Sequence, residues 1–223
     1  MSEVYKTYRN KSGELLKIIY DEDASNPLSN ADTLYYLYTW SRKYNSIQAN
    51  PYRTMEEFID TYLGEGSFAR YREKCIESGL NSVEFANVLC EQLSKRKGIL
   101  AFPILSYNNG DIQYYLGDNI DRWDGTVSGF AWVAKYKVYQ EFGVSKISSK
   151  LTEHLKSHIT SDLDFYNKYV RGDSYGFELY GSDGKFLDSG YGIYDQEDKP
   201  DYLFNTILSF LSTKDKSFVE VND

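Results

Sequence analysis

Several features of secreted and membrane proteins are scarce or absent in this sequence. The chain contains two cysteines, Cys75 and Cys90, in 223 residues, too few for a disulfide framework and, in a cytosolic setting, typical of free thiols. No apolar run approaches the roughly 18 residues that a transmembrane helix needs, and the first residues lack the apolar core of a signal peptide. We therefore expect a soluble protein that acts in the cytoplasm and does not bind membranes.

The motifs of common enzymes are also missing. No serine lies in a Gly-x-Ser-x-Gly elbow, and the sequence has neither a phosphate-binding Gly-Lys-Ser/Thr loop nor a dinucleotide-binding fingerprint. Only two histidines occur, His154 and His158, and both lie on the same predicted helix, which gives little support to nucleophilic catalysis. These absences count against an enzyme, and the sequence indicates no catalytic and no cofactor-binding residue.

Positive charge is in deficit, because the formal net charge is −8. Nucleic-acid affinity depends on neutralising phosphates with Lys and Arg, so direct binding to DNA or RNA is not expected. The one notable basic run, Lys95 to Lys97, ends a predicted helix, where it complements the helix dipole. The acidic balance is typical of a protein with a basic partner, and ordinary solubility is the alternative explanation.

Tyrosine is abundant, with 22 residues. A tyrosine side chain combines a large apolar ring with a hydroxyl group, so it suits surfaces that become buried on association. The alternative is that many of these side chains lie half-buried on strands and helices of the protein itself.

Turn signals between apolar segments predict antiparallel strands. The segments Val4–Tyr8 and Leu15–Tyr20 flank a turn and form one predicted hairpin, and Asn109-Gly110 and Asp183-Gly184 mark two more. Residues 30–97 are predicted to be rich in helix, beginning with an apolar helix through Leu34 and Trp40. The last ten residues are predicted to be a frayed tail.

Helix caps support this organisation. Thr54 and Glu57 form a capping box, Asn81 precedes an apolar stripe at helical spacing, and a long amphipathic helix is predicted to end near Gly172. Together these elements predict an α+β fold. We expect a mostly antiparallel sheet with packed helices in a single domain over residues 1–223, with a helix-rich insertion at about 30–97 and a sheet-rich core at about 98–195.

The histidines are the first candidate metal ligands. His154 and His158 are four residues apart on a predicted helix, which places both imidazoles on one face, where they can bind zinc. A carboxylate such as Glu153 or Asp162 could assist them, and a Cys2His2 site with Cys75 and Cys90 is a further alternative. The remaining explanation is that both imidazoles lie on the solvated edge of the helix's apolar stripe.

Acidic loops are the second candidate. The carboxylates of Asp21, Asp23 and Asp124, with Asp121 beside the last, could hold a hard cation such as calcium or magnesium. Turn hydrogen bonds and loop capping are the alternative role for these side chains. The sequence therefore predicts at most one divalent metal ion, zinc if the histidines bind it, with the two sets of ligands as alternatives and not as one site.

Short motifs in the second half of the chain resemble those of a known family. They are Arg122-Trp123-Asp124-Gly125, Gly129-Phe130, Tyr175-Gly176-Phe177 and Asp188-Ser189-Gly190-Tyr191-Gly192. Together they resemble a family of acidic accessory proteins of Firmicute phages and mobile elements, whose pattern reads roughly Trp-Asp-x-Gly-Gln-x-Gly-Phe, then Gly-x-x-Tyr-Gly-Phe and Asp-Ser-Cys-Trp-Gly. The chain departs from the family at Leu28-Ser29, where relatives tend to have Arg-Glu.

This resemblance implies a function that the residues alone do not name. Elements of this kind commonly encode inhibitors of host defence, so the expected protein is an anti-CRISPR protein, similar to the type II-A inhibitors of streptococcal phages. It would bind Cas9 directly in the bacterial cytoplasm and prevent nucleic-acid loading or cleavage. Two alternatives stay open: a metal-dependent hydrolase or nuclease that uses the acidic loops, and a phage regulatory protein without a defence target.

Overall fold

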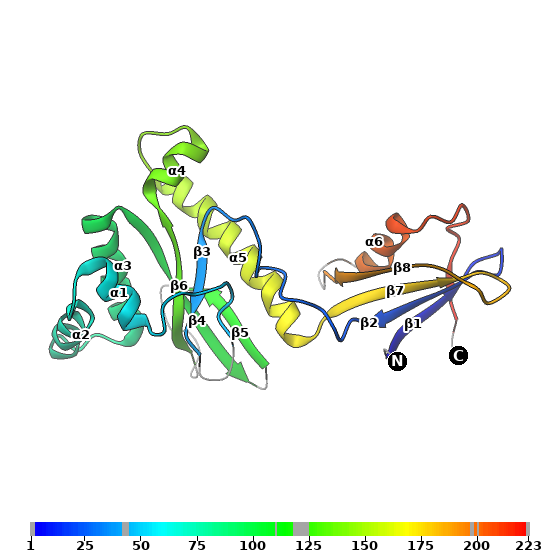
Figure 1. The fold of residues 1–223 in the computed structure, drawn as a ribbon, viewed down its shortest axis with the longest axis horizontal. Helices are drawn as coiled ribbons and strands as arrows, with labels where there is room; N and C mark the ends of the chain where they lie inside the picture. The colour runs from blue at the N-terminus through cyan, green and yellow to red at the C-terminus, as the bar shows by residue number, and fades with distance from the viewer. Residues whose placement is uncertain are drawn as a thin grey trace. The chain divides into compact units, whose positions relative to one another are not determined.

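A computed structural model describes residues 3–41, 45–109, 111–117, 125–196, 199 and 201–221. The fold is α+β, with helices packed on two antiparallel sheets (Figure 1), as the sequence predicts. The chain divides into two compact units: unit 1 comprises residues 1–26 and 168–223, and unit 2 comprises residues 27–167. The two units do not coincide with the predicted helix-rich insertion at about 30–97 and sheet-rich core at about 98–195. The expectation of a single domain stays a prediction.

Unit 1 contains a five-stranded sheet in the order β8-β7-β2-β1-β9. Its strands are β1 (Val4–Arg9), β2 (Leu15–Tyr20), β7 (Ser174–Tyr180), β8 (Phe186–Tyr194) and β9 (Val219–Glu220). The hairpins β1–β2 and β7–β8 confirm two of the predicted turns. The predicted frayed tail is wrong in part, because β9 pairs with β1 through Tyr8 and Arg9.

The core of unit 1 lies on one face of this sheet, beneath α6 (Tyr202–Phe210) (Figure 1). Alternate strand residues point toward the helix, as the two-residue period of a strand requires. The ring of Tyr8 stacks on Phe204 with centroids 4.4 Å apart. The buried members of this core are Tyr8, Leu16, Ile18, Tyr175, Phe177, Leu179, Ile193, Leu203, Ile207, Leu211 and Phe218.

Unit 2 contains a four-stranded sheet in the order β3-β6-β4-β5. Its strands are β3 (Tyr36–Thr39), β4 (Ile99–Asn109), β5 (Asp111–Leu116) and β6 (Thr126–Ala134). The β4–β5 pairing agrees with the predicted hairpin, although its turn residue Gly110 lies outside the described residues. The helix predicted through Leu34 and Trp40 is wrong, because this segment forms β3 and pairs with β6.

Five helices of the described chain belong wholly or mainly to unit 2: α1 (Met55–Leu63), α2 (Ser67–Glu77), α3 (Ser82–Lys97), α4 (Lys135–Phe142) and α5 (Ser149–Arg171). The predicted N-caps are confirmed, since Thr54 accepts a hydrogen bond from the Glu57 N–H and Asn81 forms a full capping box with Glu84. The predicted capping box at Thr54 is formed only in part, because the Glu57 carboxylate accepts from the Arg53 N–H. Helices α1 and α3 bury apolar side chains against one face of the sheet. Helix α5 packs on the other face, where Tyr166 contacts Tyr114 of β5.

Candidate functional site

The structure brings the two histidines together. His154 and His158 lie one turn apart on α5, are exposed, and have their Nε2 atoms 3.2 Å apart. Neither carboxylate that the sequence suggested as a helper is free. Glu153 forms an ion pair with Lys156 at 3.4 Å, and Asp162 accepts a hydrogen bond from the Tyr35 hydroxyl at 2.7 Å. Burial, together with that hydrogen bond, raises the pKa of Tyr35.

The acidic residues are not gathered into a metal site within the described part of the chain. Asp21 Oδ2 accepts a hydrogen bond from the Gly192 N–H at 2.9 Å, and Asp23 is exposed in the turn after β2. Asp124 and Asp121 lie outside the described residues. Among the residues that are described, no three His, Cys, Asp or Glu side chains are grouped as metal ligands. A cation at these aspartates stays a prediction, while Asp21 has a structural role.

The cysteines do not join the histidines. Cys75 of α2 and Cys90 of α3 are free thiols, as predicted, and both are buried in the helical part of unit 2. Burial raises the pKa of the Cys90 thiol, which disfavours the thiolate that metal binding requires. Because these four residues form no ligand group, the Cys2His2 alternative is wrong: two of its members are core residues and two are exposed on α5.

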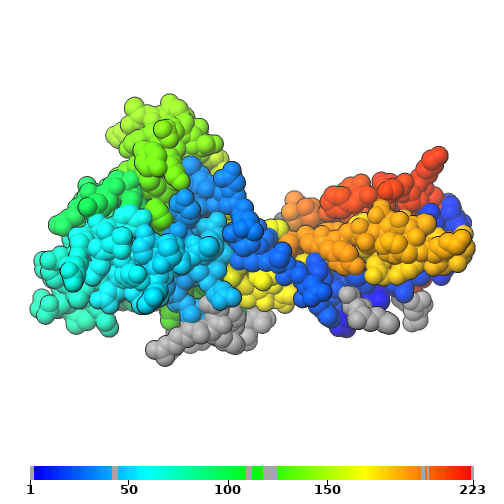
Figure 2. All heavy atoms as spheres, in the orientation of Figure 1, coloured from blue at the N-terminus to red at the C-terminus, as the bar shows by residue number. Residues whose placement is uncertain are grey.

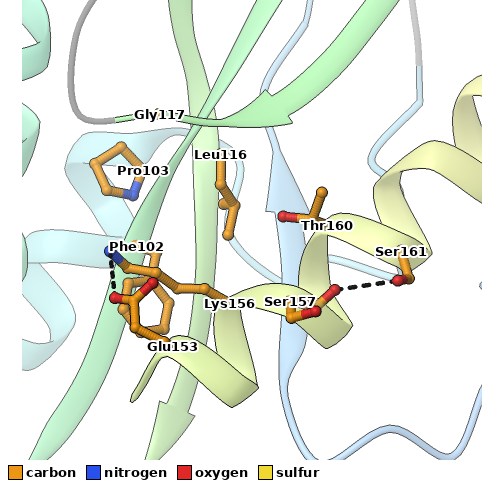
Figure 3. A pocket seen from close by; sticks show the side chains of 9 residues that line it. All are labelled: Phe102, Pro103, Leu116, Gly117, Glu153, Lys156, Ser157, Thr160 and Ser161. Carbon is orange, nitrogen blue, oxygen red and sulfur yellow. Dashed lines mark hydrogen bonds and ion pairs between the residues drawn. The ribbon is translucent and has the colours of Figure 1, made fainter. Parts of the chain in front are cut away.

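A cavity of about 370 Å³ lies between α5 and the strands β4 and β5 of unit 2 (Figure 3). The strands contribute an apolar wall, and α5 contributes a polar one. The wall residues are Phe102, Pro103, Leu116 and Gly117 from the strand side and Glu153, Lys156, Ser157, Thr160 and Ser161 from the helix. The volume is that of a site for a small molecule or for one side chain of a partner.

Three of the polar side chains that line this cavity are engaged with neighbours. The Lys156 ammonium lies 5.7 Å from the centre of the Phe102 ring, in addition to its ion pair with Glu153. The Ser161 hydroxyl donates to the Ser157 carbonyl oxygen at 3.1 Å, so it is engaged within the helix (Figure 3). An activated serine needs a base within hydrogen-bonding reach, and the lining residues pair their one carboxylate with lysine instead.

A second surface lies on the face of the unit 1 sheet opposite α6. Tyr180 of β7 is paired with Phe186 of β8, and their rings meet edge to face at 6.0 Å. Tyr191 lies on the same face, because a Cβ on Gly176 would come within 2.6 Å of the Tyr191 ring. Phe186 and Tyr191 are 58% and 55% exposed. We refer to Tyr180, Phe186 and Tyr191 as the aromatic face.

Polar contacts hold Tyr180 of the aromatic face in place. Lys17 of β2 places its ammonium 5.6 Å from the centre of the Tyr180 ring. The Tyr180 hydroxyl donates to Glu178 at 2.7 Å, and this hydrogen bond raises the pKa of Tyr180. The β7–β8 segment, in yellow and orange, lies at the surface of unit 1 in Figure 2. Rings that are ordered by neighbours and still exposed lose little side-chain entropy when a partner covers them.

Acidic charge is concentrated in the unit that carries this face. Unit 1 contains 16 of the 33 Asp and Glu residues but only 10 of the 25 Lys and Arg residues. Its net charge is therefore −6, against −2 for the larger unit 2, which has 17 acidic and 15 basic residues. A basic partner would consequently be attracted to unit 1 more strongly than to unit 2.

Sequence reasoning identified the tyrosine excess but not the residues that form the aromatic face. Some tyrosines are core residues instead, such as Tyr38 and Tyr114, which are 6% and 1% exposed. The predicted Asp183-Gly184 turn could have identified one pair of this face. In a hairpin the residues at similar distances on either side of the turn lie opposite each other, which places Phe186 near Tyr180 on the neighbouring strand. Without the position of α6, however, the sequence does not show which face of the hairpin is covered.

Comparisons with known proteins add no assignment. No family model, no curated protein and no solved structure matches the chain. Among the described residues, no helix is both long enough and apolar enough to cross a lipid bilayer.

Proposed function

We propose that this chain is a binding protein that inhibits a host defence nuclease by direct contact, and that Cas9 is its partner in the bacterial cytoplasm. The observation that carries the proposal is the exposed aromatic face on the acidic unit of the molecule. The proposed inhibitor needs no catalysis of its own, because it occupies a surface that the nuclease uses for guide RNA or DNA.

The aromatic face supplies the proposed centre of contact. Several large exposed apolar side chains on one face of a sheet are typical of interaction surfaces, whereas scattered single ones are common on any protein. Here Tyr180 and Phe186 are in contact, and Tyr191 lies on the same face beside Gly176. Aromatic side chains at the centre of an interface often account for about 2 kcal/mol or more of binding free energy each. Phe186 and Tyr191 are therefore the residues that we expect to contribute most.

The net negative charge of unit 1 supplies the proposed electrostatic attraction to a basic partner. A Cas9-type nuclease holds its guide–target duplex in a positively charged channel. An acidic protein is attracted to such a channel and competes with the nucleic acid that belongs there. The choice of Cas9 among basic partners comes from the resemblance to phage and mobile-element accessory proteins.

The proposal is tested by measuring binding to purified Cas9 and Cas9 cleavage of a target plasmid. The double variant Phe186→Ala/Tyr191→Ala should bind at least about 30-fold more weakly, which corresponds to about 2 kcal/mol, and should restore cleavage. Phe210→Ala is the matched control, because Phe210 belongs to the same unit and is 59% exposed, close to the 58% of Phe186. Its binding should stay within about twofold of the parent chain.

Three other outcomes would change the proposal. If the parent chain neither binds Cas9 nor reduces cleavage, the proposal is wrong. Equal losses in the double variant and in Phe210→Ala would leave an inhibitor but remove the aromatic face as its contact. Metal-stimulated cleavage of DNA or RNA by the chain alone, abolished by Asp124→Ala, would establish the nuclease alternative instead.

A further inference from the structure

The histidine pair on α5 has the geometry of a chelate, independently of the proposed function. The Nε2 atoms of His154 and His158 are 3.2 Å apart, and the two rings are inclined at 87°. In the metal-free pair, one Nε2–H donates to the lone pair of the other Nε2. A metal ion binds both nitrogens once the donated proton has moved, through solvent, from Nε2 to Nδ1 of its own ring and both Nε2 lone pairs turn toward the ion.

The separation of the two nitrogens matches known coordination distances. A Zn–N bond is about 2.0–2.1 Å long, so two imidazole nitrogens at a tetrahedral angle lie about 3.3 Å apart. The same bonds at a right angle would place them about 2.9 Å apart. The observed 3.2 Å falls between these values, so neither histidine needs to move its backbone to bind.

Neighbouring side chains hold His154 in place, and both histidines remain accessible to solvent. The ring of Phe142, at the end of α4, contacts His154 edge to face with centroids 6.0 Å apart. Both histidines are exposed, and the neighbouring carboxylate of Glu153 is held by Lys156. Since the described residues form no group of three ligands, the remaining coordination positions are open to water or to an atom of another molecule.

We propose that His154 and His158 chelate one divalent transition-metal ion at the surface of α5, with Zn²⁺, Ni²⁺ and Cu²⁺ as the ions that fit. Imidazole nitrogen suits these ions, whereas Mg²⁺ and Ca²⁺ take oxygen ligands. For such a nitrogen site, Cu²⁺ binds more tightly than Ni²⁺ or Zn²⁺. The bound ion links two successive turns of α5 and therefore stabilises this helix in unit 2.

The test is isothermal titration of the untagged full chain with Zn²⁺, Ni²⁺, Cu²⁺ and Mg²⁺. One equivalent of each transition metal should bind, Cu²⁺ most tightly, and Mg²⁺ should not bind. His158→Ala should weaken Zn²⁺ binding at least about tenfold, because the second bond of a chelate forms within one molecule. Both histidines are exposed, so circular dichroism should show that the variant keeps its helices.

A relocated pair distinguishes chelation from general histidine binding. Lys150 is exposed four residues before His154, so Lys150→His/His158→Ala restores the same spacing one turn earlier and should recover Zn²⁺ binding. His158→Ala/Ser161→His has the same number of histidines, but seven residues apart, and should not recover it. Equal Zn²⁺ affinity in the parent chain, in His158→Ala and in the variant with distant histidines would overturn the proposal.

Discussion

The side-chain amide of Asn167 forms two hydrogen bonds with the backbone of Tyr114. The Tyr114 N–H donates to Asn167 Oδ1, and Asn167 Nδ2 donates to the Tyr114 carbonyl oxygen, each at 2.8 Å. β5 is an edge strand of the unit 2 sheet, and a single residue of α5 thus takes the place that a further strand would have. The pair is buried, so water does not satisfy these backbone groups in its place.

Asn167→Ala should destabilise the protein by about 2–4 kcal/mol, because it leaves a buried N–H and a buried carbonyl without partners. Urea unfolding followed by circular dichroism measures this change. Asn205→Ala is the control, since Asn205 is also helical but exposed, and it should alter stability by less than about 0.5 kcal/mol. A small effect of Asn167→Ala would show that this pair contributes little to the fold.

Gly129 is required by the close approach of β6 to β3. A Cβ at this position would collide with the Tyr38 carbonyl oxygen and would come within 2.8 Å of Thr39 Cα. Because backbone atoms cannot rotate away, Gly129→Ala should cost about 3 kcal/mol or prevent folding. Thr126→Ala, on the same strand but exposed, should cost less than about 1 kcal/mol. Thermal unfolding of both variants provides the comparison.

The segment around Leu37 shows why part of the fold could not be predicted from the sequence. Leu37 and Tyr38 point to opposite faces of β3, and both are buried, at 0% and 6% exposure. Helices cover both faces of this sheet, so its strands lack the alternation of apolar and polar residues that identifies a strand. The hairpins of unit 1 were predictable because Asp183-Gly184 and the turn after Tyr8 are local signals.

The candidate sites also differ in whether local sequence alone could predict them. The contact between His154 and His158 follows from the period of one helix, so the sequence alone predicts it. The position of Asp21 beside Gly192 depends on strands more than 150 residues apart in the chain, and sequence spacing does not reveal it. The cavity beside Phe102 and the aromatic face likewise require the pairing of distant segments.

Acid should weaken a contact between the β1–β2 turn and the C-terminal segment. Hydrogen bonds from Ser217, and then from Ser12, lower the pKa of Asp215 from 3.8 to about 2. A carboxyl whose folded pKa is depressed contributes stability above its unfolded pKa and loses it as the pH falls through the folded value. The contribution of Asp215 should therefore be complete above about pH 5 and should disappear between about pH 4 and pH 2.

The measurement for Asp215 is a carboxyl carbon titration by nuclear magnetic resonance. Ser217→Ala should raise the pKa of Asp215 toward 3.8, because it removes the hydroxyl that donates at 2.5 Å. Asp215→Asn should remove this part of the acid dependence of stability. An unchanged titration midpoint in Ser217→Ala would contradict the assigned cause.

Binding to a basic nuclease should depend on salt mainly through the association rate. Unit 1 has a net charge of −6, and long-range attraction between opposite charges is screened over about 8–10 Å at physiological ionic strength. Raising the salt concentration from about 50 to 500 mM should therefore slow association with Cas9 at least about tenfold while changing dissociation much less. The double variant Phe186→Ala/Tyr191→Ala should speed dissociation and change the association rate much less, since it removes short-range contacts and leaves the charge unchanged.

Stopped-flow or surface-plasmon kinetics separate the effect of salt on association from the effect of the variant on dissociation. Salt-independent association with a partner that still binds would exclude electrostatic steering and leave the aromatic face as the basis of recognition.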